Sequence, residues 1–292
     1  MLKETIFRSS IGNAPYLRKI RSLRKSINIW QILAMPLVLF IFIPIFALMV
    51  KTPLDTFLKN LNQSQLVQAI SLSLVTSLTT AFITLLLGTP VSIFLTYRSN
   101  RLFPIVDTLV DLPTVLPPSV AGIALLMAFG RKGIFGSFLS SLGITIPFTM
   151  LAVVIAQTFV ASPFYIKAAA IGFSSVDEEL KQAAALDGAN RWEILRYVIF
   201  PIVWSSLLSG AVMTWARALG EFGATIIFAG NFPGRTQTMP LAIYIGFEVN
   251  LDVALTLSVI LICLSFLTLI VIKGFLHRRL EYSLKKSSDP AF

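Results

Sequence analysis

Two charged side chains, Arg217 and Glu221, stand inside a long apolar stretch of the chain. Their spacing of four residues would place them on one face of a helix, where a guanidinium and a carboxylate can pair. A charge at membrane depth is costly unless it is paired or reached by water. The face that carries them therefore either lines a pathway and gate, with Arg217 favouring an oxyanion, or holds a structural ion pair that locks two helices.

Small and helix-breaking residues accompany this pair. Gly220 and Gly223 provide small surfaces on which a helix can approach a neighbour, including the same helix of a second copy. Upstream, the sequence LPTVLPPSVAG includes Pro117 and Pro118 and must break or kink a helix. Irregular backbone at membrane depth is tolerated where protein buries it or where it lines a wet cavity. We expect these residues to line a pathway, the alternative being a kink that serves packing only.

The one long polar interval between apolar runs is residues 174–201, called here the polar hairpin. The pattern predicts a capping box between Ser175 and Glu178 that begins a short helix. Asp187-Gly188 predicts a turn in which glycine takes positive φ, and a second amphipathic helix is expected over 191–198. The shape is a handle for a partner outside the membrane, or an ordinary interhelical loop.

Composition indicates an all-α integral membrane protein. The chain has 292 residues, 55% of them hydrophobic and 13% charged, with a mean hydropathy of +0.81, more apolar surface than a soluble core can bury. The net charge of +10 does not indicate nucleic-acid binding, because the basic residues flank apolar runs. With Cys263 and His277 as the only residues of their types, we expect no disulfide, metal site or histidine catalysis.

Six apolar runs are long enough to cross a bilayer, which takes about 20 helical residues. A basic cytoplasmic extension, residues 1–28, precedes them, and a cytoplasmic tail, residues 277–292, follows the membrane domain of residues 29–276. The predicted spans are Ile29–Val50, Leu66–Tyr97, Phe103–Phe129, Phe148–Phe173, Tyr197–Gly230 and Val253–Ile272.

Lysine and arginine residues predict the orientation of these spans. With both termini in the cytoplasm, 18 of the 24 lie on the inner side and five on the outer side, Arg217 being set apart. Positive residues favour the cytoplasmic side. The polar hairpin is therefore expected in the cytoplasm, and residues 130–147 and 231–250 on the outer side.

The run QAAALDGA at 182–189, followed by Ile199-Phe200-Pro201, resembles the EAA loop of ABC importer permeases. The resemblance implies that the polar hairpin forms the coupling helix that docks on the ATP-hydrolysing subunit. Ala183, Ala184 and Gly188 match the pattern, whereas Gln182 stands where the motif has glutamate. The residues expected to couple are Glu178, Glu179, Gln182, Ala183, Ala184, Asp187, Gly188 and Ala189.

The spans themselves resemble the molybdate/tungstate and sulfate permeases of that superfamily, over about Trp30 to Ile272. LPTVLPPSVAG, the run from Ala216 to Tyr244 and the six-span layout carry this likeness, and GEFGAT with the following NFPG and TQTMP is closer to the molybdate type. The resemblance implies the type I ABC importer permease fold, a plasma (inner) membrane location and alternating access. The pathway and gate residues expected from it and from the residue types are Arg217, Glu221, Gly220, Gly223, Pro117 and Pro118.

No catalysis is expected on this chain. The glycines and lysine of GRKGIFGS, residues 130–137, do not have the spacing of a phosphate-binding loop, so ATP and Mg²⁺ would be bound by separate ATPase subunits. The resemblance further implies a second permease copy and an extracytoplasmic substrate-binding protein as partners. Two alternatives remain: a sulfate/thiosulfate permease of the same superfamily, and an ion-gradient-driven secondary transporter, for which Asp107, Asp111 and Glu221 would be the membrane carboxylates.

Overall fold

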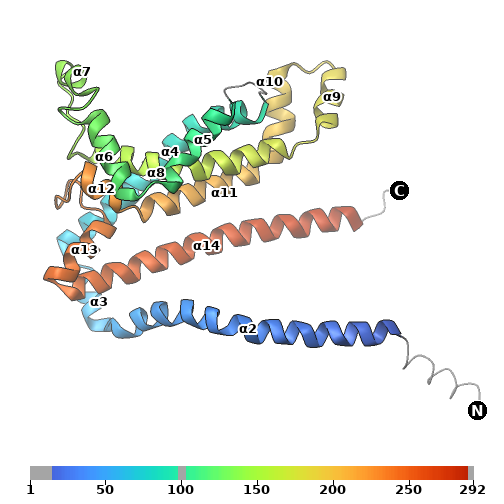
Figure 1. Ribbon diagram of the computed structural model, residues 1–292, viewed down its shortest axis with the longest axis horizontal. Helices are drawn as coiled ribbons and strands as arrows, with labels where there is room; N and C mark the ends of the chain where they lie inside the picture. The colour runs from blue at the N-terminus through green and yellow to red at the C-terminus, as the bar shows by residue number, and fades with distance from the viewer. Residues whose placement is uncertain (1–14, 98–102, 289–292) are drawn as a thin grey trace, which may run out of the picture. The chain divides into compact units, whose positions relative to one another are not determined.

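A computed structural model describes residues 15–97 and 103–288, with side chains over 29–97 and 104–270 and at Gly274. Every regular element in this part of the chain is helical (Figure 1), so the all-α prediction is confirmed. The chain divides into two compact units, residues 1–53 and 54–292, and each is described by itself. The basic residues of the predicted N-terminal extension and the tail from His277 lie outside the described side chains.

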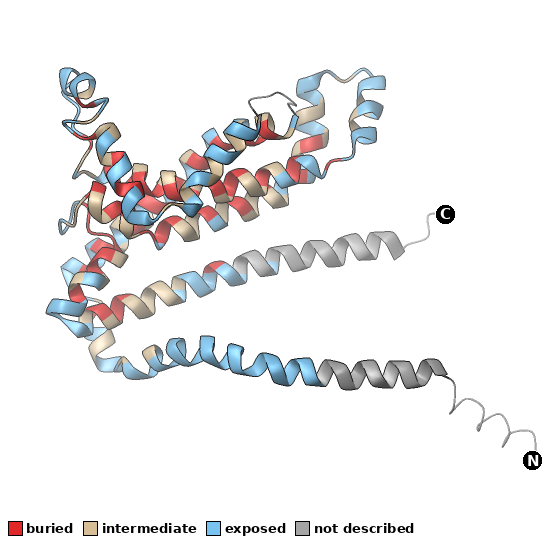
Figure 2. Ribbon diagram, viewed as in Figure 1, coloured by how far each residue is buried: buried red, intermediate tan, exposed pale blue. Residues whose placement is uncertain are grey.

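The first unit holds one long helix, α2 (Pro15–Lys51). Proline suits the first turn of a helix, because its missing N–H has no intrahelical partner there. From Ile29 to Lys51 the helix is apolar enough to cross a membrane, and none of its side chains is buried within the unit (Figure 2). A helix that is apolar on all sides suits a lipid environment.

The second unit contains the remaining spans. Five helices in the described residues are long and apolar enough to cross a membrane, and the bent pair α5–α6 makes a sixth, which agrees with the six predicted spans. The elements of the second unit are α3 (Leu54–Asn60), α4 (Ser64–Tyr97), α5 (Phe103–Val115), α6 (Pro118–Phe129), α7 (Gly136–Ser141), α8 (Met150–Ser174), α9 (Glu178–Leu186), α10 (Arg191–Glu193), the π-helix η1 (Ile194–Ile199), α11 (Phe200–Leu219), α12 (Gly223–Phe228), α13 (Met239–Val249) and α14 (Leu251–Ser288).

The core of this unit lies where α4, α8 and α11 pack against one another. Glycines allow the close approach: a Cβ on Gly88 would lie 2.8 Å from the ring of Tyr165, and one on Gly172 would lie 2.5 Å from Cβ of Ser206. Gly210 also faces Tyr165. Its small surface is therefore used within the chain by α8.

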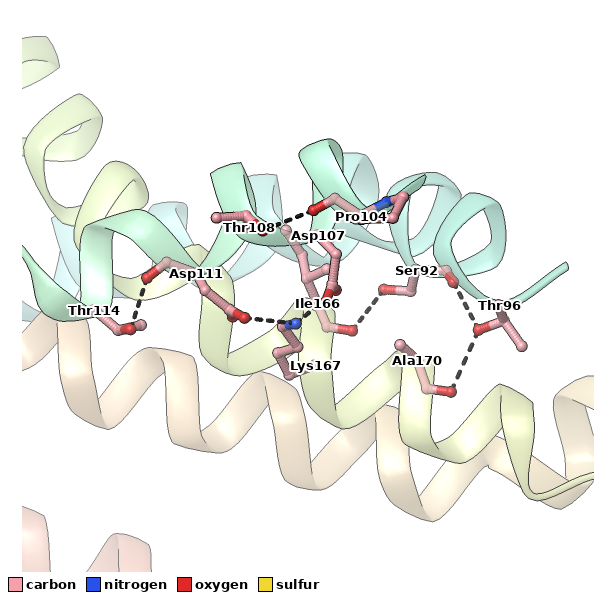
Figure 3. A network of polar contacts seen from close by, with 10 residues as sticks. All are labelled: Ser92, Thr96, Pro104, Asp107, Thr108, Asp111, Thr114, Ile166, Lys167 and Ala170. Carbon is pink, nitrogen blue, oxygen red and sulfur yellow. Dashed lines mark hydrogen bonds and ion pairs between the residues drawn. The ribbon is translucent and has the colours of Figure 1, made fainter. Parts of the chain in front are cut away.

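Hydroxyl side chains four residues apart line the face of α4 that meets α8. Those of Thr80, Ser92 and Thr96 reach the α8 carbonyl oxygens of residues 154, 166 and 170 at 3.1–3.4 Å. The offset is 74 residues in each case, so the two helices run parallel in constant register (Figure 3 shows the last two contacts). Ser92 and Thr96 each lie closer, at 2.7 and 2.9 Å, to a carbonyl of their own helix.

Two of the predicted spans are interrupted. The third bends by 118° between α5 and α6, where Pro117 and Pro118 cannot donate backbone hydrogen bonds, so the predicted proline break is confirmed. The fifth span was predicted as one helix from Tyr197 to Gly230. That prediction is wrong, because α11 ends at Leu219 and α12 begins at Gly223, with Gly220 as the C-cap.

Candidate functional site

The two interruptions meet, and together they are called here the double break (residues 116–118 and 220–223). A Cβ on Gly223 would lie 2.5 Å from Cβ of Pro118. One on Gly122 would lie 2.8 Å from Cβ of Ile227 and 2.9 Å from the carbonyl oxygen of Ala224. The half-helices α6 and α12 therefore pack backbone against backbone beside the breaks. Of the predicted pathway residues, Pro118 and Gly223 meet in this junction, and Pro117 and Gly220 lie in the two breaks themselves.

Arg217 and Glu221 form the predicted ion pair at the same place. Arg217 Nη1 lies 2.9 Å from Glu221 Oε2, and the Glu221 side chain is only 2% exposed. The other carboxylate oxygen, Oε1, accepts a hydrogen bond from the Ala224 N–H at 2.8 Å. Both oxygens of this buried carboxylate therefore have a polar partner, which offsets part of the cost of its burial. It also lies near the N-terminus of α12, where the helix dipole favours a negative charge.

The pair arises differently from the sequence expectation. Glu221 is not on the helix that carries Arg217, because α11 ends two residues before it and the Gly220 N–H closes the last turn on Ala216. The break places the carboxylate between the last turn of α11 and the first turn of α12. Glycines on both sides of Glu221, at 220 and 223, were the sequence signal for this interruption.

Arg217 keeps part of its side chain accessible. Its side chain is 32% exposed, and a guanidinium has five N–H donors in a planar fork, so it can accept a second negatively charged partner. A Cβ on Gly220 would meet only Ala216 of its own helix, at 3.8 Å. The position of Gly220 therefore has open space around it.

The polar hairpin lies at the opposite end of the α8–α11 pair from α12 (Figure 1). A helix of 20 residues such as α11 spans about 30 Å, which separates the hairpin from the double break. Gly188 has φ of +91°, and its N–H bonds to Ala185 while the Ala189 N–H bonds to Ala184. These two bonds form a Schellman motif, so the predicted glycine turn is confirmed.

The predicted capping box at Ser175 and Glu178 is wrong. Helix α8 extends to Ser174, so the Ser175 N–H is already bonded to Ile171 and its hydroxyl donates to Gly172. An N-cap residue needs an extended backbone, whereas Ser175 has φ of −81° and ψ of −5°. A capping box instead begins the second helix of the hairpin, between Asn190 and Glu193.

The second helix of the hairpin does not end at residue 198. It continues from Arg191 through the π-helix η1 into α11, so the chain is helical to Leu219. The prediction of a separate helix over 191–198 is therefore wrong. Pro201 has no N–H to bond to Tyr197, and its ring crowds that carbonyl. The helix widens there, and the Phe200 N–H bonds to Leu195, five residues back.

The residues expected to couple lie on an accessible surface. None of the residues of α9 is buried, which leaves this face available to a partner. Six of the expected coupling residues are exposed, and Ala184 and Ala189 are half-buried; the exposed ones are Glu178, Glu179, Gln182, Ala183, Asp187 and Gly188.

One charged cluster was not predicted from the sequence. Lys167 of α8 lies 2.6 Å from Asp107 and 2.8 Å from Asp111, both on α5 (Figure 3). All three side chains are between one-third and one-half exposed. The i, i+4 spacing of the two aspartates was the available signal, but nothing local indicated which lysine would reach them. The cluster ties the helix before the proline break to α8.

The comparisons with known proteins agree with this architecture. Residues 88–285 match the family described as binding-protein-dependent transport system inner membrane component. The chain belongs to this family. Among relatives, it is 41% identical over 208 residues to the "Probable transport system permease protein NifC" of Clostridium pasteurianum, covering 71% of this chain and 73% of that protein.

This member of the transport family is also similar to a second relative and to a solved structure. The chain is 35% identical over 233 residues to the molybdenum transport system permease protein ModB of Mycobacterium tuberculosis, covering 80% of this chain and 88% of ModB. A chain from a bacterial ABC transporter that imports alginate shares the fold, with a TM-score of 0.67 at 16% identity, covering 89% of this chain and 98% of its own. The expected type I importer permease fold is therefore confirmed.

Proposed function

We propose that this chain is the membrane-spanning permease subunit of an ATP-driven importer of a tetrahedral oxyanion, molybdate or the similar tungstate. The observation that carries the proposal is the 35% identity, over 80% of this chain, to a protein named for molybdenum transport. The family match over residues 88–285 supports the role of an inner membrane component. Location in the plasma (inner) membrane, with several passes and both termini cytoplasmic, belongs to the same proposal.

The polar hairpin is the proposed contact with the ATPase. Its accessible α9 face and the Schellman turn at Gly188 present a short helix away from the bundle. ATP and Mg²⁺ are bound by the ATPase subunits, and this chain contributes no catalytic group. The residues proposed to make this contact are Glu178, Glu179, Gln182, Ala183, Ala184, Asp187, Gly188 and Ala189.

The double break is the proposed gate. Pro117, Pro118, Gly220 and Gly223 interrupt two spans at one place, about 30 Å along α11 from the hairpin. Arg217 attracts the oxyanion, while Glu221 neutralises part of the positive charge of Arg217. An anion facing one partly neutralised guanidinium is held weakly and can move on, so selection among oxyanions falls to the binding protein.

Alternating access connects the two sites. Closure of the ATPase subunits displaces the docked hairpins, and the helix that runs without interruption from Arg191 to Leu219 carries the movement to Arg217. A second permease copy completes the pathway. The binding protein docks on the outer segments, residues 130–147 and 231–250.

Reconstitution in liposomes tests this function. The chain, the ATPase and the binding protein encoded with it should import radiolabelled molybdate only with internal ATP, with unlabelled tungstate competing better than sulfate. Sulfate or thiosulfate competing better than molybdate would favour the other permease type. Uptake that follows an ion gradient and needs no ATPase would overturn the proposal.

A further inference from the structure

Helix α9 of the polar hairpin contacts the end of α4 through one side chain. Lys181 Nζ lies 4.6 Å from the centroid of the Tyr97 ring, within the roughly 6 Å over which a cation is attracted to an aromatic face. The same Nζ lies 2.9 Å from Glu178 Oε2. The Lys181 side chain is 15% exposed and that of Glu178 is 68% exposed, so the lysine is covered while its carboxylate partner remains in solvent.

Tyr97 continues the connection into α8. Its hydroxyl lies 3.4 Å from the Phe173 carbonyl oxygen, one residue before the end of α8, and Tyr97 is itself the last residue of α4. The ring therefore receives the cation of α9 on its face and contacts α8 through its hydroxyl. Three elements meet at Tyr97, and two of them are the helices held in constant register along the core.

An ordinary surface ion pair between Lys181 and Glu178 would explain their contact, but it would not require the lysine to lie on the Tyr97 ring. Glu178 is exposed, so the same ion pair could form with the lysine side chain extended into solvent. No residue of α9 itself is buried; the nearest apolar anchor is Val176, two residues before the helix, which is 5% exposed and packs in the core cluster with Phe173. Within α9, the cation of Lys181 over Tyr97 is the contact with the end of α4.

We propose that Lys181 is a positioning residue, whose cation over Tyr97 transmits the displacement of α9 to the joined ends of α4 and α8. The inference rests on the proposed function, because the displacement is supplied by the ATPase. Glu178 orients the lysine through its carboxylate. In this assignment Glu178 acts within the hairpin as well as on its accessible surface.

Four variants of the full complex separate the cation, the ring and the hydroxyl. Lys181→Met removes the charge at similar length, and Lys181→Arg keeps a cation. Tyr97→Leu removes the ring, and Tyr97→Phe removes only the hydroxyl. The measurement is ATP hydrolysed per molybdate imported, together with copurification of the ATPase.

We expect K181M and Y97L each to raise this ratio by about fivefold, the range of a cation–π contact, with the ATPase still copurifying. K181R should stay near wild type, Y97F should lie between wild type and Y97L because it keeps the ring but loses the hydroxyl contact with α8, and the double variant K181M/Y97L should match either single variant. An unchanged ratio in K181M, or a loss of uptake that only parallels lost ATPase or lost membrane insertion, would overturn the role. Additive effects in the double variant would do the same.

Hydrogen exchange on the purified permease gives a reading that needs no transport. The amides of residues 178–186 should exchange faster in K181M and Y97L than in K181R, Y97F and wild type. Equal exchange in all five proteins contradicts the contact itself. If the wild-type complex imports nothing with ATP, the proposed function fails. The hydrogen-exchange comparison still tests the contact between Lys181 and Tyr97 independently of transport.

Discussion

At the residue scale, Gly188 has a backbone conformation that restricts substitution. Its φ of +91° is in the left-handed region, yet a Cβ built there meets nothing within 4 Å. A substitution is therefore limited by backbone conformation and not by space. A β-branched residue in this region costs about 1–2 kcal/mol, whereas asparagine tolerates it.

Gly188→Val should consequently abolish uptake and uncouple ATP hydrolysis while the chain remains inserted in the membrane. Gly188→Asn is the matched control, and it should retain most of the uptake. Both are measured as molybdate import and ATPase activity in the reconstituted complex. Wild-type transport with normal coupling by the valine variant would contradict the role of the turn.

Arg217 and Glu221 allow a second test at this scale. Arg217→Met leaves a buried carboxylate without its counter-ion, which costs about 3–5 kcal/mol. Glu221→Gln should cost less, since an amide oxygen can still accept from the Ala224 N–H. A double-mutant cycle on uptake and on unfolding in detergent should give strong coupling between the two positions. Additive losses would show that the pair does not act as a unit.

At the element scale, the contact between α4 and α8 depends more on packing than on hydroxyl bonds. Ser92 has one hydroxyl proton, and its shorter contact, 2.7 Å, is to Gly88 of its own helix, against 3.1 Å to Ile166. Polar contacts between membrane helices average about 0.6 kcal/mol. A side chain on Gly88 instead must displace the ring of Tyr165, which is fully buried.

We therefore expect Ser92→Ala to lower the free energy of unfolding by ~0.5 kcal/mol, and Gly88→Val by about 2–3 kcal/mol through overpacking. Unfolding of the purified chain by denaturing detergent measures both. A larger loss from Ser92→Ala than from Gly88→Val would mean that the hydroxyl contacts, and not the close approach, hold the two helices in register.

The two helix breaks also belong to this scale. Each one alone is explained by its own residues, the prolines at 117 and 118 and the glycine pair at 220 and 223. Only their contact, Pro118 against Gly223, makes them one structural feature. A rearrangement of either break must displace the other, which is the property that a gate requires.

At the scale of the whole molecule, orientation in the membrane is the main prediction. Cys263 is the only cysteine, so Cys263→Ala gives a background in which single cysteines report on sidedness. Asp187→Cys in the polar hairpin should react with a membrane-impermeant maleimide in inverted vesicles only. Ser137→Cys, in the outer segment, should react in intact cells only. Labelling from the opposite sides would reverse the predicted topology.

The sequence alone determined the features that depend on local chemistry. Long uncharged runs specified six spans, since the bilayer requires about 20 apolar residues for each. Proline at 117 and 118 specified a break, and Asp187-Gly188 a turn, because both act through the φ angle and N–H of their own residues. The Arg217–Glu221 ion pair could also be predicted from the sequence, because the two residues are four positions apart.

The tertiary structure decided where helices end and which distant residues meet. Helix α8 continues to Ser174, which removes the capping box predicted at Ser175, and the second break packs against α6. Lys167 meets Asp107 across 60 residues, and Lys181 meets Tyr97 on another helix. Such contacts depend on the register and crossing angle of packed helices, which cannot be deduced from the sequence of any single segment.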